Sequence, residues 1–311
     1  MTTPILRIGS RGSPLALNQA EIVRTALIAA HPILAEPGAI DIVPIRTTGD
    51  RIQDRTLAEA GGKGLFTKEI EEALLAGAVD LAVHSAKDMQ TWLPDGLAIG
   101  GVLPREDPRD VLISNSRAAK LGTLPPGAVL GTASLRRQAQ ALMRRHDLKV
   151  VPFRGNVETR LNKLSAGMAD ATLLALAGLK RLGRENVGVV LEPAEMLPAA
   201  GQGVLAIEIR AGDRRLEVLL EPVHHAATAA SLAAERALLA ALDGSCRTPI
   251  AALAEPEEHS LRLRALVALP DGSRAYEDSG TAPLDDAVLL GNEIGRRLLA
   301  KAGADFLRGR S

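Results

Sequence analysis

The sequence is poor in several residue types from which functional sites are often built. It has one cysteine in 311 residues, which excludes an internal disulfide and is typical of a reducing compartment. Aromatic residues make up 2% of the chain, so its cores must be built mainly from Leu, Val, Ile and Ala. Lys and Arg number 37, as do Asp and Glu. A net charge of zero argues against the basic field of a nucleic-acid-binding protein.

Long hydrophobic runs are also missing. No apolar stretch in the sequence is long enough to span a bilayer. Met1–Pro4 leads directly into a short apolar segment, without the basic and apolar regions of a signal peptide. We therefore expect a soluble, cytoplasmic protein. Hydrophobic residues still make up 46% of the chain, and the length permits two or three domains.

The N-terminal part of the chain alternates predicted strands with predicted helices. Strands are expected over 6–9, 40–45 and 80–84, and helices over 15–30 and 65–75. This alternation is typical of βαβ units with a largely parallel sheet. In such sheets, ligands bind beyond the carboxyl ends of the strands. The loops of this kind carry Arg11, Ser13, Lys63, Ser85, Lys87 and Asp88.

A second α/β pattern follows the charged, proline-containing segment 103–110, which we interpret as a domain crossing. Its predicted strands are 129–132, 150–153 and 171–175. Segment 198–203 indicates a second crossing. The alternating strand 204–209 that follows is expected to rejoin the first sheet.

The pattern changes again from about residue 224. A helix is expected over 226–242, followed by the alternating stretch 261–267, a returning strand over 274–277 and a final helix over 283–302. The pair Asp271–Gly272 is a hairpin signal between the strands. We therefore predict an α/β protein with two doubly wound lobes and a small C-terminal α+β domain with an antiparallel sheet.

Five arginines lie at or near strand-to-helix turns of the second pattern: Arg136, Arg137, Arg154, Arg160 and Arg181. Helix N-termini present free N–H groups and a positive dipole end, and guanidinium groups bind carboxylate or phosphate through two hydrogen bonds. Thr132, Ser134 and Asn156 add neutral donors, and Ser134 can cap the helix that begins at Leu135. Any one of these arginines has the alternative of a surface ion pair with Asp or Glu. Five at corresponding ends indicate a polyanion of modest size, held between two lobes.

Asp88 is the only acid in the loop 85–88. A carboxylate near several cations stays ionised, so it is suited to stabilising a cationic intermediate or exchanging protons with an amine. The alternative role is that of a loop cap.

The single cysteine, Cys246, lies between an alanine-rich helical run and the predicted strand 250–254. Gly244 can adopt the positive φ that ends a helix. Arg247 favours the thiolate, which is the nucleophilic form. The alternative is that Cys246 is a small buried hydrophobic residue.

Other site types have little support. The six histidines show no metal-ligand spacing, so we predict no metal and interpret His224–His225 as a solvated pair. The glycines around Lys63 lack the spacing of a phosphate-binding P-loop.

Taken in order, eight segments of the chain resemble those of the porphobilinogen deaminase family. A single segment is weak evidence for the family, but the ordered set is specific to it and covers nearly the whole chain. The segments are 7–17, 61–66, 82–88, 105–110, 131–137, 154–157, 201–203 and 244–246.

The resemblance implies three domains, of which the first two resemble the lobes of periplasmic binding proteins joined by two crossing segments. The expected boundaries are 1–103 with 202–221, 104–201, and 222–311. It also implies a transferase of tetrapyrrole (haem or chlorophyll) biosynthesis that joins four porphobilinogen molecules head to tail, releases ammonia at each step and yields hydroxymethylbilane. The primer is a dipyrromethane cofactor, made from two substrate units and held to Cys246 through a thioether. A monomer is expected.

The resemblance also implies roles for individual residues. Asp88 matches the catalytic carboxylate, which would stabilise the cation formed when ammonia leaves. The residues that match cofactor contacts, besides Cys246, are Ser85, Lys87, Thr132, Ser134, Arg136, Arg137, Arg154 and Gly155. Those that match substrate contacts are Arg11, Ser13, Lys63, Phe66, Arg160, Arg181 and Gln202. Met89–Gln90 departs from the Val-Pro frequent in relatives, Ser245 from a frequent glycine, and Glu59 from the lysine of some relatives.

Two other classes of function remain as alternatives. The same lobes and arginines would serve a non-enzymatic binder of a small anion, but such a protein has no use for a reactive cysteine on a third domain. A transcriptional effector domain has weaker support, because no helix-turn-helix precedes the first lobe. Asp88 and Cys246 are both present, which argues against an inactive relative.

Overall fold

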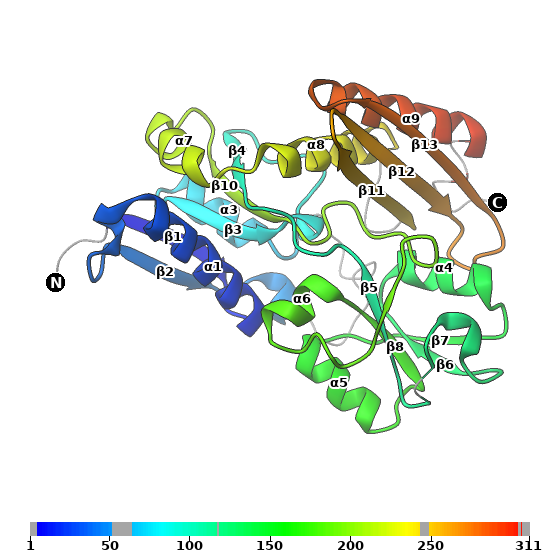
Figure 1. Cartoon of the computed structure of the whole chain (residues 1–311). Coiled ribbons are helices and arrows are strands. Elements are labelled where there is room, and N and C mark those ends of the chain that lie inside the picture. Colours follow the sequence, from blue (N-terminus) through cyan, green and yellow to red (C-terminus); the bar gives the residue numbers. More distant parts are fainter. Residues whose placement is uncertain (1–4, 52–63, 117, 243–248, 304–305, 307–311) are drawn as a thin grey trace. The chain divides into compact units, whose positions relative to one another are not determined.

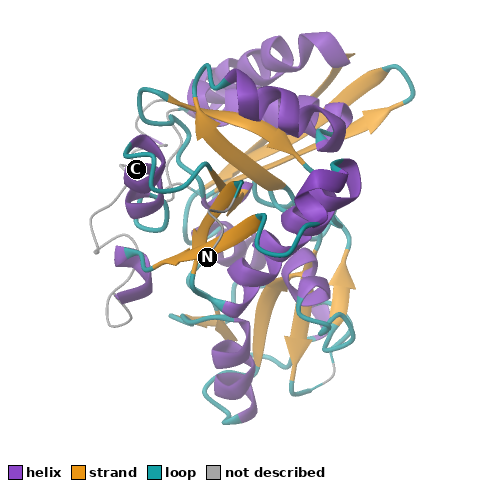
Figure 2. Cartoon of the chain, turned by 90° about the vertical axis from the view of Figure 1, so that its left-hand side faces the viewer, coloured by secondary structure: helices purple, strands orange, loops and turns teal. Residues whose placement is uncertain are grey.

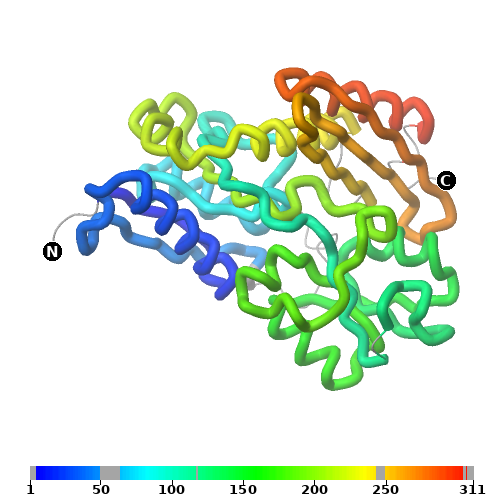
Figure 3. The backbone as a smooth tube through the Cα atoms, viewed as in Figure 1, coloured from blue at the N-terminus to red at the C-terminus, as the bar shows by residue number. Residues whose placement is uncertain are grey.

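The computed structural model describes residues 5–51, 64–116, 118–242, 249–303 and 306 (Figure 1). Within these residues, the strands form two five-stranded sheets and one three-stranded sheet (Figure 2). The chain divides into two compact units. The first contains the described parts of Met1–Gln53, Gly62–Glu106 and Val204–Ala229, and the second contains those of Asp107–Gly203 and Ala230–Ser311. Figure 3 traces the path of the chain through them.

The first unit is built on a mixed sheet with the strand order β2-β1-β3-β10-β4. Its strands are β1 (Leu6–Arg11), β2 (Ile40–Ile45), β3 (Leu81–Ser85), β4 (Leu97–Val102) and β10 (Leu205–Arg210). Strand β1 runs parallel to β2 and β3, whereas β10 runs antiparallel to β3 and β4. The prediction that the segment after the second crossing rejoins the first sheet is confirmed by β10.

Apolar side chains on both faces of this sheet explain where its helices pack. The helices are α1 (Pro14–Ala30), α2 (Thr48–Arg51), α3 (Lys68–Leu75) and α7 (Arg214–Leu220). One face packs against α1 and α7 in a single buried cluster that includes Leu6, Val23 and Leu216. The other face packs against α3 through Ile70 and Leu74. Burial on both faces is typical of parallel strands between helical layers.

The second unit contains a sheet of the same kind, with the order β7-β6-β8-β5-β9. Its strands are β5 (Asp110–Ser114), β6 (Val129–Gly131), β7 (Lys149–Val151), β8 (Ala171–Ala175) and β9 (Val189–Leu191), and its helices are α4 (Leu135–Arg144), α5 (Val157–Ser165) and α6 (Leu176–Arg181). Strand β6 is parallel to β7 and β8, and β5 is antiparallel to β8 and β9. In both sheets, the fourth strand is the antiparallel one, and it lies beside a crossing segment in the sequence.

The C-terminal part of the second unit is an antiparallel sheet with helices on one face. It comprises α8 (Ala226–Ala241) from Ala230 onward, β11 (Ile250–Glu257), β12 (Ser260–Ala268), β13 (Ala275–Pro283) and α9 (Ala287–Ala302). A Cβ atom added at Gly295 would lie 2.6 Å from Cβ of Ala241, so glycine lets α9 approach α8 closely. The predicted α/β class with a C-terminal antiparallel sheet is confirmed.

The opposite face of the C-terminal sheet packs within the second unit against α4 and the segment before the second crossing. Ala139, Leu197 and Leu253 belong to one buried cluster there, and the backbone N–H of Ala252 donates to the carbonyl of Pro198 at 3.0 Å. The second and third predicted domains therefore share a core, and their exact boundaries stay a prediction. No described helix is long and apolar enough to cross a membrane.

Candidate functional site

The turn that carries Asp88 is held in place by its first residue. Strand β3 ends at Ser85 and continues into the 3-10 turn η2 (Ala86–Asp88). Ala86 is buried, and its backbone N–H donates to the carbonyl of Val204 at 3.0 Å. Lys87 and Asp88 are exposed on the same turn. The fold therefore presents a carboxylate and an ammonium group at the carboxyl end of a buried strand, where an α/β sheet places its ligands.

Ser85 and Ser13, two other predicted contacts in this unit, already make hydrogen bonds within the chain. The side-chain amide of Gln19 donates to Oγ of Ser85 at 2.9 Å. Oγ of Ser13 accepts from the backbone N–H of Ala16 at 3.3 Å and so caps α1. Both hydroxyl groups are half-buried.

Arg11 and Phe66 are brought together although they are far apart in the sequence. The guanidinium carbon of Arg11, at the end of β1, lies 4.3 Å from the centre of the Phe66 ring. Such a cation–π contact orients the planar guanidinium group. The ring of Phe66 packs so closely on Gly49 that a Cβ atom there would overlap it. Phe66 is thus fixed by its packing on α2, and it holds Arg11 in turn.

The sequence did not predict a group of buried ionisable side chains beneath β3. Nε2 of His84 lies 3.0 Å from Oε2 of Glu208 on β10, and both side chains are almost wholly buried. Glu71, on α3, is also buried and interacts electrostatically with both. The amide of Gln90, two residues after Asp88, donates to Glu71 at 3.5 Å. The one available signal was an acidic residue, Glu208, inside the otherwise apolar stretch 205–209.

Burial raises the pKa of Glu71. A hydrogen bond with Thr67 opposes this rise, the nearby charge of Glu208 adds to it, and smaller effects of His84 and Gln90 oppose it. A carboxyl group whose pKa is raised by folding binds its proton more tightly in the native state. Its contribution to stability is therefore complete below the unfolded pKa, near 4.5, and is lost as the pH rises through the folded pKa.

We expect Glu71→Gln to increase the free energy of unfolding relative to the wild type as the pH rises above about 4.5. The gain is about 1.4 kcal/mol for each unit by which folding raises the pKa. Urea denaturation of both proteins between pH 4 and 8 measures it. The control is Glu72→Gln, because Glu72 is exposed on the same helix. A stability difference that does not change with pH would refute this account of Glu71.

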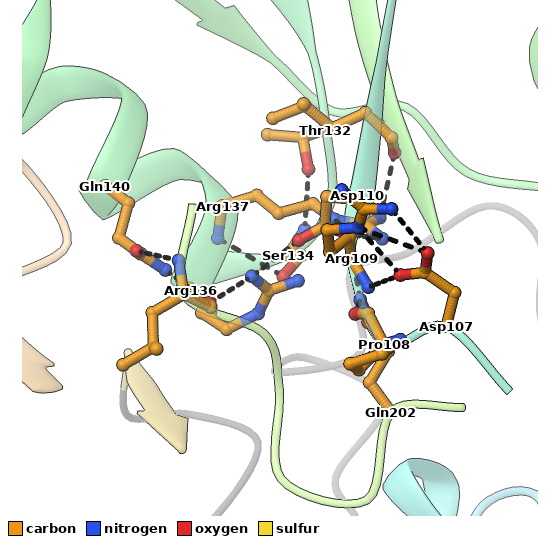
Figure 4. Close-up of polar contacts among 12 residues, drawn as sticks. Asp107, Pro108, Arg109, Asp110, Thr132, Ser134, Arg136, Arg137, Gln140 and Gln202 are labelled. Atoms are coloured by element: carbon orange, nitrogen blue, oxygen red, sulfur yellow. Dashed lines mark hydrogen bonds and ion pairs between the residues drawn. The ribbon is translucent and has the colours of Figure 1, made fainter. Parts of the chain in front are cut away.

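The second unit contains a buried network around Asp110 (Figure 4). Asp110 is the first residue of β5 and has no exposed surface. Its Oδ1 accepts from Nη2 and Nε of Arg137 at 2.7 and 3.1 Å. Its Oδ2 lies 2.8 Å from Nη1 of Arg136. Burial by itself would raise the pKa of Asp110, but the two guanidinium groups hold it well below its ordinary value.

The polar residues that lead into α4 shape its N-terminus. Oγ of Ser134 accepts from the backbone N–H of Arg137 at 3.4 Å, which confirms the predicted cap. Oγ1 of Thr132 accepts from the backbone N–H of Ser134 at 3.1 Å. A Cβ atom at Gly131 would lie 2.6 Å from the ring of Phe153, so only glycine fits at the end of β6.

Gln202 joins the same network. Its side-chain amide donates to the carbonyl of Pro108 at 2.6 Å and to Oδ1 of Asp110 at 3.1 Å. The residue is buried, so these contacts tie the two crossing segments together within the second unit. Its expected contact with substrate stays a prediction.

The other predicted arginines lie around Gly155 and Gly203. Gly155 has a φ of +119°, which favours glycine, and it turns the chain between Arg154 and the N-cap Asn156. Nε of Arg160 donates to the carbonyl of Gly155 at 2.9 Å. Nη2 of Arg181 donates to the carbonyl of Gly203 at 2.7 Å. The five arginines therefore do not form one cluster: two meet at Asp110 and the others bind backbone carbonyls or flank this turn.

Two donor atoms of these arginines are buried without a hydrogen-bond partner. They are Nε of Arg136 and Nη1 of Arg154. Unpartnered buried donors are rare in native proteins, because each loses its bonds to water. They are well suited to an anionic ligand that carries several carboxylates.

Two of the predicted site residues cannot be placed in this site. Cys246 and Lys63 lie outside the described residues. Within the described part of the chain, no group of three or more His, Cys, Asp or Glu residues is arranged to hold a metal ion.

An open cavity of about 530 Å³ in the second unit contains none of the predicted site residues. Its charged lining is already paired: Arg109 with Asp107 and Glu192, and Arg264 with Glu255. We therefore assign it no role in binding an anion.

Known proteins of one family match almost the whole length of this chain. The family model described as "Porphobilinogen deaminase, dipyromethane cofactor binding domain" matches residues 6–218. That described as "Porphobilinogen deaminase, C-terminal domain" matches residues 229–300. The porphobilinogen deaminase of Nitrobacter hamburgensis is 53% identical over 306 residues, covering 98% of this chain and 96% of that protein. The chloroplastic enzyme of Oryza sativa subsp. japonica is 52% identical, covering 97% and 85%.

Solved structures of lower similarity match as well. The periplasmic aliphatic sulphonate binding protein SsuA from Escherichia coli is 18% identical, with a TM-score of 0.43, over 76% of this chain and 69% of that one.

Proposed function

This chain belongs to the porphobilinogen deaminase family, and from that premise we propose which of its residues carry the reaction. The enzyme is a hydroxymethylbilane synthase of tetrapyrrole biosynthesis and uses a dipyrromethane cofactor. Four porphobilinogen molecules are joined head to tail, and each coupling releases one ammonia.

The residues present fit the implied cofactor. A dipyrromethane made from two porphobilinogen units carries acetate and propionate side chains, so it is a compact polyanion. The buried donors of Arg136 and Arg154 that have no partner suit such carboxylates. Thr132, Ser134 and Gly155 surround these arginines in the sequence and join them in the proposed cofactor site, together with Ser85 and Lys87. Cys246 is the proposed point of covalent attachment.

When bound, the dipyrromethane supplies the free pyrrole carbon to which the first substrate is coupled. The substrate must first lose ammonia from its aminomethyl group, which leaves a cation conjugated with the pyrrole ring. We assign to Asp88 the stabilisation of that cation. A carboxylate fixed beside a developing positive charge lowers the barrier electrostatically. The same carboxylate would then accept the proton that the coupling releases.

The observation that carries this assignment is the exposed position of Asp88 on a turn whose first residue is buried and hydrogen-bonded. The carboxylate is thus accessible to a substrate, yet it stands on a rigid support. Substrate carboxylates are assigned to the remaining predicted contacts: Arg11, Ser13, Lys63, Phe66, Arg160, Arg181 and Gln202. Of these, Arg11 is already oriented by its stacking on Phe66.

The intact mass of the purified protein under denaturing conditions, with peptide mapping around Cys246, tests the proposal. We expect an excess equal to two deaminated porphobilinogen units on that peptide, and one ammonia released per porphobilinogen consumed. A chain that carries no such mass, gains none with porphobilinogen and still binds porphobilinogen would support the alternative of an anion-binding protein. We further propose a monomer in the cytoplasm, to be checked by light scattering and by cell fractionation.

A further inference from the structure

In the buried network of Figure 4, Asp110 lies between two arginines, Arg136 and Arg137. The proposed reaction gives it no role. It is wholly buried, and Arg136 and Arg137 are each only 6% exposed. Water therefore does little to screen the charges of this group, and their balance must come from within the protein or from a ligand.

The charges of the group do not balance. Two guanidinium groups share one carboxylate, and within the described residues no other acidic group pairs with either of them. One positive charge is left in excess in a buried place. Consistent with this cost, burial lowers the pKa of Arg136, and neighbouring Arg137 lowers it too, against the opposing effect of Asp110. A second anion at this point would be stabilising.

The two arginines differ in how fully they are bonded. Arg137 uses Nε and Nη2 on Asp110 and Nη1 on the carbonyl of Leu173 at 2.8 Å. Nη1 of Arg136 donates to the carbonyl of Leu197 at 2.7 Å and lies 2.8 Å from Oδ2 of Asp110 as an ion pair, whereas its Nε has no hydrogen-bond partner. Arg137 is therefore committed to the protein, and Arg136 keeps a free donor.

Accepting the proposed function, we infer that Asp110 is a positioning residue that takes the place of the cofactor's carboxylates in the cofactor-free chain. It neutralises one of the two guanidinium charges, holds both side chains in place, and so keeps Arg136 oriented to receive an acetate or propionate group. Arg137 then serves as the anchor of the network, and the two adjacent arginines have different tasks.

Asp110→Asn in a host that makes no porphobilinogen tests this inference. Without the carboxylate, both guanidinium groups are buried and unbalanced. The melting temperature of the cofactor-free variant should fall by roughly 5–10 °C. After loading with porphobilinogen the fall should be at most half as large, because the ligand supplies an anion. The rate of cofactor loading, monitored by intact mass, should fall by roughly tenfold or more.

Asp107→Asn is the matched control. Asp107 lies three residues before Asp110 and pairs with Arg109 at a partly exposed position. Its replacement should change neither the loading rate nor the difference in melting temperature between loaded and cofactor-free protein.

Two further variants separate the arginines and cover the case that Asp110→Asn does not fold. Arg136→Gln removes the excess charge, so the cofactor-free protein should melt within a few degrees of the wild type but fail to load. Arg137→Gln should lower the melting temperature of the cofactor-free protein. The inference would be overturned if Arg136→Gln and Arg137→Gln lowered the melting temperature of the cofactor-free protein equally. It would also be overturned if Asp110→Asn lowered the melting temperature of loaded and cofactor-free protein equally. Failure of the wild type to gain mass would instead overturn the proposed function.

Discussion

Asp88→Asn is expected to lower kcat per cofactor-loaded chain by about a thousandfold or more, with the fold retained. The amide keeps the size of the carboxylate but removes the charge that faces the developing cation and the group that accepts the proton. A thousandfold loss corresponds to about 4 kcal/mol of transition-state stabilisation. Asp88 is exposed on η2, and the turn is held through the backbone of Ala86, so the substitution should leave stability unchanged.

The measurement is single-turnover and steady-state release of ammonia, normalised to the loaded fraction from intact mass. Asp95→Asn is the control, because Asp95 is also exposed and lies only seven residues further along the chain. The control should keep wild-type turnover. If Asp88→Asn kept more than a tenth of the wild-type kcat, the assignment of Asp88 as the catalytic carboxylate would be wrong.

Cys246→Ser is expected to abolish covalently bound cofactor and to reduce turnover to background. A serine hydroxyl is a far weaker nucleophile than a thiolate at neutral pH, so the thioether has no replacement. The described elements on either side are well anchored, since Leu242 and Ile250 are buried. The protein should therefore fold normally. Its intact mass should equal that of the bare chain before and after incubation with porphobilinogen.

Ser245→Gly is the matched control for this prediction. It changes the neighbouring residue to glycine and leaves the thiol in place, so the cofactor mass should persist. Cofactor mass on the Cys246→Ser chain would show that the attachment site is another residue. Peptide mapping would then locate that residue.

Local patterns in the sequence predicted the elements that depend on local chemistry. Ser134 precedes a helical run and caps it, because an N-cap needs only a hydroxyl and the next few backbone N–H groups. The helix expected over 15–30 is observed as Pro14–Ala30, since its apolar period is contained within the segment.

Strands with little pattern of their own were missed. Leu97–Val102 contains two glycines and Val189–Leu191 has three residues, so neither has a readable alternation. Asp110 was interpreted as the end of a charged connector, but it begins β5. Its neighbours in the fold, rather than in the sequence, made it part of a strand.

The candidate site was predicted unevenly for the same reason. Asp88 could be singled out because its whole context is one short loop. The buried group of His84, Glu71 and Glu208 could not, because it needs β10 to pair with β3 and α3 to cover that face. Arg136 and Arg137 were predicted as anion ligands, but their shared partner Asp110 was not. Arg137 and Asp110 lie 27 residues apart in the sequence, so no local pattern links them.

The sequence alone determined the family, the α/β class and the chemical types available at each strand end, because ordered motifs and periodicity are properties of short segments. Only the tertiary structure decided which of those groups meet. It inserted β10 antiparallel beside β3 and so buried Glu208 against His84. It also placed one carboxylate, Asp110, between two arginines. The charge balance of a buried site depends on partners that converge from different elements, and a linear pattern does not contain that convergence.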